Sequence, residues 1–138
     1  MTAKERLREI ISLRKAAAYR RIKIEALESA AERTAAPVTG MPRAPGADPS
    51  PLASVICKKV DLEREIAEIE QKRDSMISEI DLLENDEYKT LLTLRYVEEM
   101  KWNAVMARMD YSETHIHRLH RSALEEFDKI LKVGSKWQ

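Results

Sequence analysis

The chain has 138 residues, of which 35% are charged and 5% are aromatic, and its formal net charge is zero. This length suits one domain, or a small domain with an extended element, and the shortage of aromatic residues argues against a large globular core. The single cysteine, Cys57, excludes a disulfide within the chain and fits a reducing cytoplasm.

The zero net charge conceals an uneven distribution along the chain. Residues 1–36 hold nine basic and five acidic residues, residues 52–87 hold five basic and eleven acidic residues, and residues 88–138 hold nine basic and seven acidic residues with all three histidines. The first segment therefore complements the second. The third segment stays mildly basic, so the net charge does not exclude nucleic acid as a partner.

The N-terminal region predicts a helix from about Ala3 to Arg33. Its apolar positions recur at steps of three, four and seven, with Arg20 as an interruption: Ile10, Leu13, Ala17, Ile24, Leu27 and Ala31. All five prolines and two of the three glycines follow in residues 37–51. Because proline removes a backbone donor and clashes with the preceding turn, we expect this segment to be a non-helical loop.

A second helix is predicted from about Leu52 to Leu83. Its apolar positions alternate by three and four, the coiled-coil spacing, with Arg73 at one polar position: Leu62, Ile66, Ile69, Met76, Ile80 and Leu83. Two helices of similar length and opposite charge favour an antiparallel hairpin, although each helix could instead pair with a second subunit. We expect Arg20 and Arg73 to reach the edge of the apolar row with their charged ends in water.

Three shorter helices are predicted in the C-terminal region, at about Tyr88–Tyr96, Trp102–Met109 and Glu113–Lys132. The three residues from Asp110 to Ser112 form a turn, in which Asp110 tolerates the left-handed conformation and Ser112 caps the last helix. Ala107 is small enough to let another helix approach closely. Trp102 is expected to pack on the first of these helices rather than to bind a ligand.

A helix, a short turn and a capped helix form the plan of the helix-turn-helix, whose second helix enters the major groove of DNA with its first turns. Arginine can bond guanine or phosphate there, threonine can bond either a base or a phosphate, and glutamate can accept from cytosine. The residues predicted to contact DNA are Glu113, Thr114, His115, His117, Arg118 and Arg121, with His120 nearby.

Residues 86–131 resemble region 4 of sigma factors. The matches, in order and spacing, are Leu94, Arg95, Tyr96, Ala107, Ser112, Ile116, Ala123 and Leu124; Asp110 departs from the pattern, because many helix-turn-helix proteins have glycine there. More narrowly, Met100, Trp102, Tyr111, Ser112 and His115 are similar to phage-encoded transcriptional regulators of the RinA/ArpU type. The resemblance implies that Glu113, Thr114, His117 and Arg118 face the groove.

These patterns together predict an all-α protein with two parts: a coiled-coil hairpin in residues 1–85 and a helix-turn-helix module in residues 86–138. The expected function is that of a DNA-binding transcriptional regulator, with double-stranded DNA and RNA polymerase as partners and the coiled coil as a homo-oligomer contact. Two alternatives stay open: a phage DNA-packaging subunit of the small-terminase kind, and a coiled-coil interaction module that does not bind DNA.

The sequence also argues against several classes of function. His115 and His117 lie roughly 200° apart around a helix at ~3.6 residues per turn, so they cannot share a metal ion, and no cofactor is expected. No phosphate-binding glycine loop or nucleophile-base pair indicates an enzyme. No segment approaches the ~20 apolar residues of a membrane helix, so we expect a cytoplasmic protein, in a bacterial host cell if it is phage-encoded.

Overall fold

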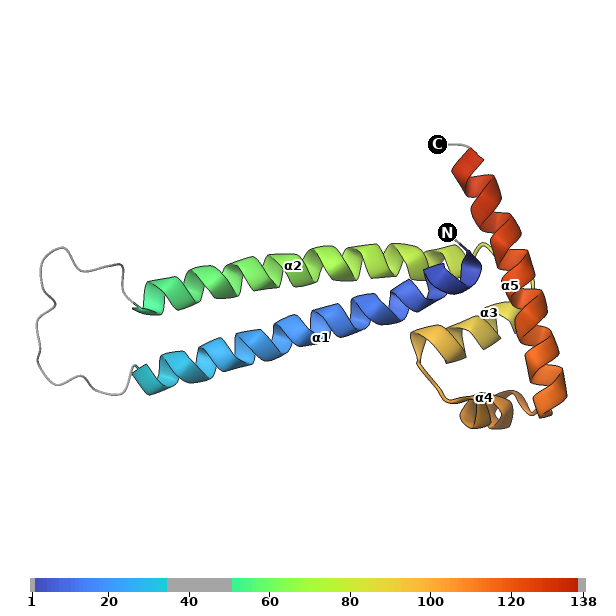
Figure 1. The fold of residues 1–138 in the computed structure, drawn as a ribbon, viewed down its shortest axis with the longest axis horizontal. Coiled ribbons are helices and arrows are strands. Elements are labelled where there is room, and N and C mark those ends of the chain that lie inside the picture. Colours follow the sequence, from blue (N-terminus) through green and yellow to red (C-terminus); the bar gives the residue numbers. More distant parts are fainter. Residues whose placement is uncertain (1, 35–50, 137–138) are drawn as a thin grey trace, which may run out of the picture. The chain divides into compact units, whose positions relative to one another are not determined.

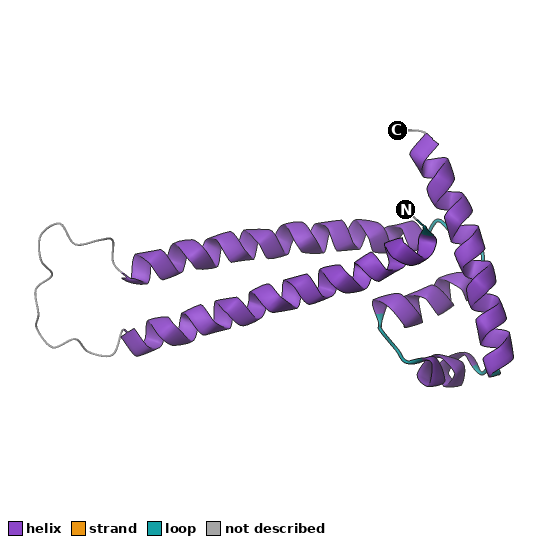
Figure 2. Cartoon of the chain, in the orientation of Figure 1, coloured by secondary structure: helices purple, strands orange, loops and turns teal. Residues whose placement is uncertain are grey.

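The computed structural model describes residues 2–34 and 51–136, and every regular element in these two ranges is helical (Figure 2). The predicted all-α class is therefore confirmed. In chain order the elements are α1 (Ala3–Thr34), α2 (Pro51–Ile80), α3 (Asp86–Leu92), a π-helical turn η1 (Thr93–Val97), α4 (Trp102–Met109) and α5 (Glu113–Lys136).

The predicted proline-rich loop lies outside the described residues except at its last position. Pro51 is the first residue of α2, so its assignment to the loop was wrong. A proline is tolerated at this position because the first amides of a helix have no partner within the helix.

Helices α1 and α2 run side by side in opposite directions, as the antiparallel hairpin predicts (Figure 1). Contacts divide the chain into two compact units: residues 15–70 form one, and residues 1–14 together with 71–138 form the other. The division predicted at residue 85 rests on sequence pattern alone and stays a prediction. We call these the hairpin unit and the C-terminal unit.

In the hairpin unit, the predicted apolar rows of the two helices face each other. Ala17, Leu62 and Ile66 are buried, and Ile24 and Leu27 are half-buried. Ion pairs flank this contact: Arg20 Nε lies 2.8 Å from Glu65 Oε2, Lys59 Nζ lies 2.8 Å from Glu28 Oε1, and Arg21 pairs with Glu70. The mainly basic α1 thus matches the mainly acidic α2.

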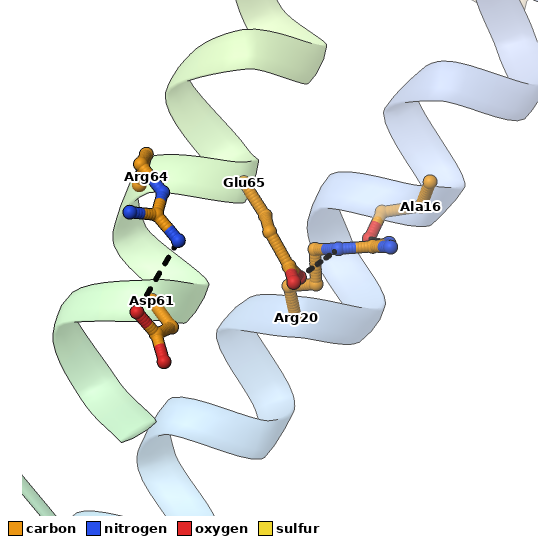
Figure 3. A network of polar contacts seen from close by, with 5 residues as sticks. All are labelled: Ala16, Arg20, Asp61, Arg64 and Glu65. Atoms are coloured by element: carbon orange, nitrogen blue, oxygen red, sulfur yellow. Dashed lines mark hydrogen bonds and ion pairs between the residues drawn. The ribbon is translucent and has the colours of Figure 1, made fainter. Parts of the chain in front are cut away.

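Arg20 is half-buried, and its charged end is bonded to protein oxygens as well as open to water. Figure 3 shows its guanidinium between Glu65 of α2 and the carbonyl oxygen of Ala16, to which its Nη1 donates at 3.0 Å. On the neighbouring turns of α2, Arg64 pairs with Asp61 at 3.3 Å. Arg20, which interrupts the apolar row, therefore donates its hydrogen bonds to oxygens of the protein.

In the C-terminal unit, the first turns of α1 pack with the last turns of α2 and with α5. Leu7, Ile10, Ile80 and Phe127 are almost completely buried. The backbone amide of Ala3 donates to Asp128 Oδ1 at 2.6 Å, which joins the beginning of α1 to α5. Further ion pairs join Arg6 to Glu79 and Arg14 to Glu99.

Arg73 also differs from its predicted role at the water-exposed edge of the row. It is half-buried, and its guanidinium donates to the carbonyl oxygens of Ile10 at 3.3 Å and of Val97 at 3.4 Å. One side chain of α2 therefore connects α1 to the end of η1. These bonds pair the charged end of a half-buried side chain with protein acceptors, which offsets the cost of removing it from water.

Across the two described ranges, the structure has no helix that combines the length and the apolar character needed to cross a membrane.

Candidate nucleic-acid interface

The turn between α4 and α5 has the predicted conformation. Asp110 ends α4 with φ 58° and ψ 47°, in the left-handed region, and its amide donates to the carbonyl oxygen of Met106. The hydroxyl oxygen of Ser112 accepts from the amide of His115 at 3.3 Å. Both predictions are confirmed, and three residues separate α4 from α5.

A small apolar cluster holds the helices around this turn. Leu91 of α3, Val105 of α4, and Ile116 and Leu119 of α5 are buried together. Partly buried side chains surround them: Tyr88, Leu94, Met100, Trp102, Met106, Met109 and Tyr111. Because this cluster takes only every third or fourth residue of α5, the remaining faces of its first turns are left to solvent.

The expectation that Ala107 allows a close approach between helices was wrong. Its side chain is exposed, whereas Val105 is fully buried. Since positions two residues apart point in directions about 200° apart on a helix, burying Val105 turns Ala107 outward.

All six residues predicted to contact DNA are exposed, and all lie on the first two and a half turns of α5: Glu113, Thr114, His115, His117, Arg118 and Arg121. The buried partners on the same turns are Ile116 and Leu119. The polar residues therefore cover the sides of α5 that do not pack on the cluster.

The three histidines have different surroundings. The ring of His115 stacks on Tyr111 with 4.2 Å between ring centroids, and His117 Nε2 lies 3.8 Å from Glu113 Oε1. His120 is half-buried instead, with its Nε2 2.9 Å from the hydroxyl of Tyr96. His120 therefore supports the fold of the module, while the other two remain on its surface.

An aromatic group fixes the beginning of α4 against α5. The Trp102 ring lies 4.8 Å from the His120 ring between centroids, and the guanidinium carbon of Arg95 lies 4.6 Å from the Trp102 centroid. Arg95 also donates to the carbonyl oxygen of Met100 at 2.8 Å. Trp102 therefore packs within the module, as the sequence predicts, although its partners include α5.

Burial shifts the pKa values of two side chains, those of His120 and Tyr96. Desolvation, together with the positive charges of Lys4, Arg95 and His117, lowers the pKa of His120 from 6.5 to about 4. Burial also raises the pKa of the Tyr96 hydroxyl, against the opposing effect of Arg95 and Arg8. Both side chains are thus neutral near pH 7, and this partly buried pair carries no charge.

Two further exposed bases of the module, Lys101 and Arg108, lie at the two ends of α4. Arg108, in the last turn of α4, lines a hollow of about 340 Å³ together with Asp86 and Glu87. Lys101, immediately before α4, is exposed, and its side chain makes no capping bond to the helix. Lys101 was not among the residues predicted to contact DNA.

Asn85 was also missed as a helix cap. Its side-chain oxygen accepts from the amides of Glu87 at 2.8 Å and Tyr88 at 3.3 Å, and α3 therefore begins at Asp86 rather than Tyr88. An asparagine followed by two acidic residues is the usual signal for a helix start.

The described part of the chain contains no group of three or more histidine, cysteine, aspartate or glutamate residues arranged to hold a metal ion.

Comparison with known proteins places the chain in one family. Residues 51–128 match the model of a family described as protein of unknown function (DUF1492). The chain belongs to this family. The matched segment begins with α2 and ends within α5, so it contains the turn and all six exposed residues, whereas α1 lies before it. No curated protein and no solved structure matches the chain.

Proposed function

We propose that this member of the DUF1492 family is a DNA-binding transcriptional regulator that reads promoter DNA with the first turns of α5. The observation that carries the proposal is the geometry of α4, the three-residue turn and α5. The turn is held by Asp110 and Ser112, the cluster below it is apolar, and the leading turns of α5 expose polar side chains only. This is the arrangement that places a helix in the major groove.

The exposed side chains suit distinct contacts. Arg118 and Arg121 supply positive charge and forked donors for guanine or phosphate. Thr114 can bond a base or a phosphate, and Glu113, at the start of the helix, can accept from cytosine. His117 and His115 can each offer a ring nitrogen to an acceptor on the DNA.

The likeness of residues 86–131 to sigma-factor region 4, and to phage regulators of the RinA/ArpU type, supports transcription as the process involved. It suggests RNA polymerase as a second partner and the cytoplasm of a bacterial host as the location. With two arginines on the leading turns, one module binds DNA weakly, because neutralised phosphates supply most non-specific affinity. A homo-oligomer formed by the hairpin would bring two modules to one site.

The test is fluorescence anisotropy with labelled duplexes that tile the DNA on both sides of the gene, over a salt series. We expect binding that weakens with salt, and we expect the Arg118→Ala/Arg121→Ala variant to lose about tenfold or more of its affinity.

The matched control is Lys89→Ala/Lys129→Ala, which also removes two positive charges from the C-terminal unit. Both lysines lie outside the leading turns, in surface ion pairs with Asp86 and Glu126. If the two double variants lost equal affinity for DNA, the loss would follow net charge alone, and the assignment of α5 as the recognition helix would be refuted. If wild-type protein bound none of the duplexes, alone or with RNA polymerase, the proposed function would be wrong.

A further inference from the structure

The hairpin unit buries little of its own apolar surface. Among its described residues, 15–34 and 51–70, three apolar side chains are buried, whereas five large ones are more than half exposed: Tyr19, Ile22, Leu52, Ile56 and Val60. A pair of helices covers only one side of each partner, whereas helices in proteins gain most of their stability from packing. These five side chains do not form one patch, because Val60 and the buried Leu62, two residues apart on α2, point about 200° apart. Tyr19 is the largest of the five.

A groove lies on one face of this unit, between α1 and α2, with a volume of about 490 Å³. Its apolar lining comes from Ala26 and Leu27 of α1 and from Leu62 of α2. Lys23 and Lys58 contribute positive charge to the same groove, and Asp61 and Glu65 contribute negative charge. In the chain itself, Asp61 and Glu65 are paired with Arg64 and Arg20 (Figure 3).

Tyr19 stands beside this groove. The ammonium group of Lys23, which lines the groove, lies 5.5 Å from the centroid of the Tyr19 ring. The Tyr19 residue itself is 58% exposed. One face of the hairpin unit therefore carries a projecting aromatic ring next to an apolar hollow of a size that accepts one.

We propose that this face binds a second copy of the chain, with Tyr19 of each copy inserted in the groove of the other. Tyr19 and Leu27 are eight residues apart, about 12 Å along α1 at ~1.5 Å per residue. A twofold axis that crosses α1 between them places each tyrosine at the partner's groove, since a twofold contact uses the same patch on both molecules. Tyrosine is also among the residues that most often dominate binding energy at interfaces.

Charge favours a second copy over nucleic acid as the occupant. The described residues of the hairpin unit include eight basic and eight acidic residues, so the unit is neutral and offers no excess positive charge to phosphates. Within the groove, two lysines and two carboxylates balance each other. An identical copy is neutral as well, so the two units meet without net charge repulsion.

The available area fits a dimer of ordinary size. Each helical segment of the hairpin unit is about 30 Å long, and two helices side by side are about 20 Å wide. One face therefore offers about 600 Å² per copy, or about 1,200 Å² in total, which is the lower limit for a specific, stable interface. We expect a dimer that dissociates at measurable concentrations.

The test is sedimentation equilibrium of the full chain without DNA, so that the result does not depend on the proposed function. We expect wild-type protein to form a dimer. Ala26→Arg introduces a long charged side chain into the groove, and Tyr19→Ala removes the inserted ring; each should raise the dimer dissociation constant about tenfold or more. Both sites are exposed in the monomer, so helix content measured by circular dichroism should not change.

The matched control is Ala67→Arg on α2. Ala67 is exposed and follows Glu65 by two residues, so it points about 200° away from the groove. It should leave the dimer intact, as should Arg118→Ala/Arg121→Ala. A monomeric wild type, or a dimer weakened as much by Ala67→Arg as by Ala26→Arg, would overturn the proposal, as would a dimer that Tyr19→Ala leaves unchanged.

Discussion

His117 and His120 occupy successive turns of α5, and both rings contact Trp102, but the two side chains differ in burial. His117 is exposed beside Glu113, whereas His120 is half-buried against Tyr96 and Trp102. The neutral imidazole of His120 avoids the free-energy cost of a buried charge, and its bond to Tyr96 satisfies both polar groups. At the scale of single residues, the same amino acid therefore serves the surface at one position and the fold at another.

The lowered pKa of His120 predicts that acid destabilises the C-terminal unit. The folded-state pKa is about 4 and the ordinary value is 6.5, so the unfolded chain binds the proton more readily. Stability is fully present above pH 6.5 and is lost as the pH falls towards 4. After allowance for solvent screening of a partly exposed ring, we expect a loss of about 1–2 kcal/mol in the free energy of unfolding.

The comparison is with His120→Gln, which keeps a polar side chain but cannot take up a proton. Chemical denaturation at several pH values should give a steeper loss between pH 6.5 and 4 for wild type than for this variant. An NMR titration should place the midpoint for the His120 ring near 4; a midpoint of 6 or higher would contradict the burial argument.

At the scale of elements, the helix limits depend on caps and turns. Helix α4 has the predicted limits, Trp102 and Met109, because the left-handed Asp110 ends it. Helix α2 ends at Ile80 instead of Leu83, since bonds of the shorter i to i+3 type close its last turn, as from the amide of Leu83 to the carbonyl oxygen of Ile80 at 3.1 Å. Such choices depend on local hydrogen bonds that apolar spacing does not encode.

The π-helical turn η1 is a second feature that apolar spacing missed. The predicted single helix from Tyr88 to Tyr96 is divided into α3 and η1, and the amide of Glu98 donates to the carbonyl oxygen of Thr93 at 2.9 Å. Glu99 then takes a positive φ of 54°, and its carboxylate pairs with Arg14 at 2.5 Å. The widened turn brings the Val97 carbonyl within reach of Arg73.

Arg73→Met should destabilise the C-terminal unit by about 1–3 kcal/mol, because the hydrogen bonds from Arg73 to the carbonyl oxygens of Ile10 and Val97 would be lost. Methionine keeps most of the aliphatic volume, so the change tests the hydrogen bonds. Urea denaturation measures the free energy of unfolding. Lys72→Met, at the exposed neighbouring position, is the control and should alter stability by less than about 0.5 kcal/mol. Equal effects of the two substitutions would show that the bonds of Arg73 contribute nothing.

At the scale of the whole molecule, the family match and the two compact units divide the chain differently. The match to the DUF1492 family runs from α2 into α5, whereas the C-terminal unit also includes the first turns of α1. Leu7 and Ile10 of α1 are completely buried there. The C-terminal unit of this chain therefore depends on a segment that precedes the family match.

If the hairpin unit forms the proposed dimer and α5 binds DNA, the two proposals are linked. A dimer presents two modules to a site with two half-sites, and linking them increases the effective affinity. Ala26→Arg should therefore lower the affinity of the full chain for its best duplex about tenfold or more, although it leaves α5 unaltered. Fluorescence anisotropy measures this loss, with Ala67→Arg as the control. If Ala26→Arg were monomeric and its affinity for DNA were unchanged, a single helix-turn-helix module would be sufficient for binding.

The sequence by itself determined the helical class and the turn between α4 and α5, and it favoured an antiparallel pairing of α1 with α2 while leaving pairing between subunits open. These features follow from local chemistry: apolar residues at helical spacing, a left-handed Asp110 and the capping Ser112. The tertiary structure decided which polar side chains turn inward. Arg73 and His120 look like surface residues in the sequence. In the structure, Arg73 is hydrogen-bonded to the Ile10 carbonyl and His120 to the Tyr96 hydroxyl, both far away in the chain. The reason is that the burial of a polar group depends on its partner, and only the folded chain brings that partner into contact.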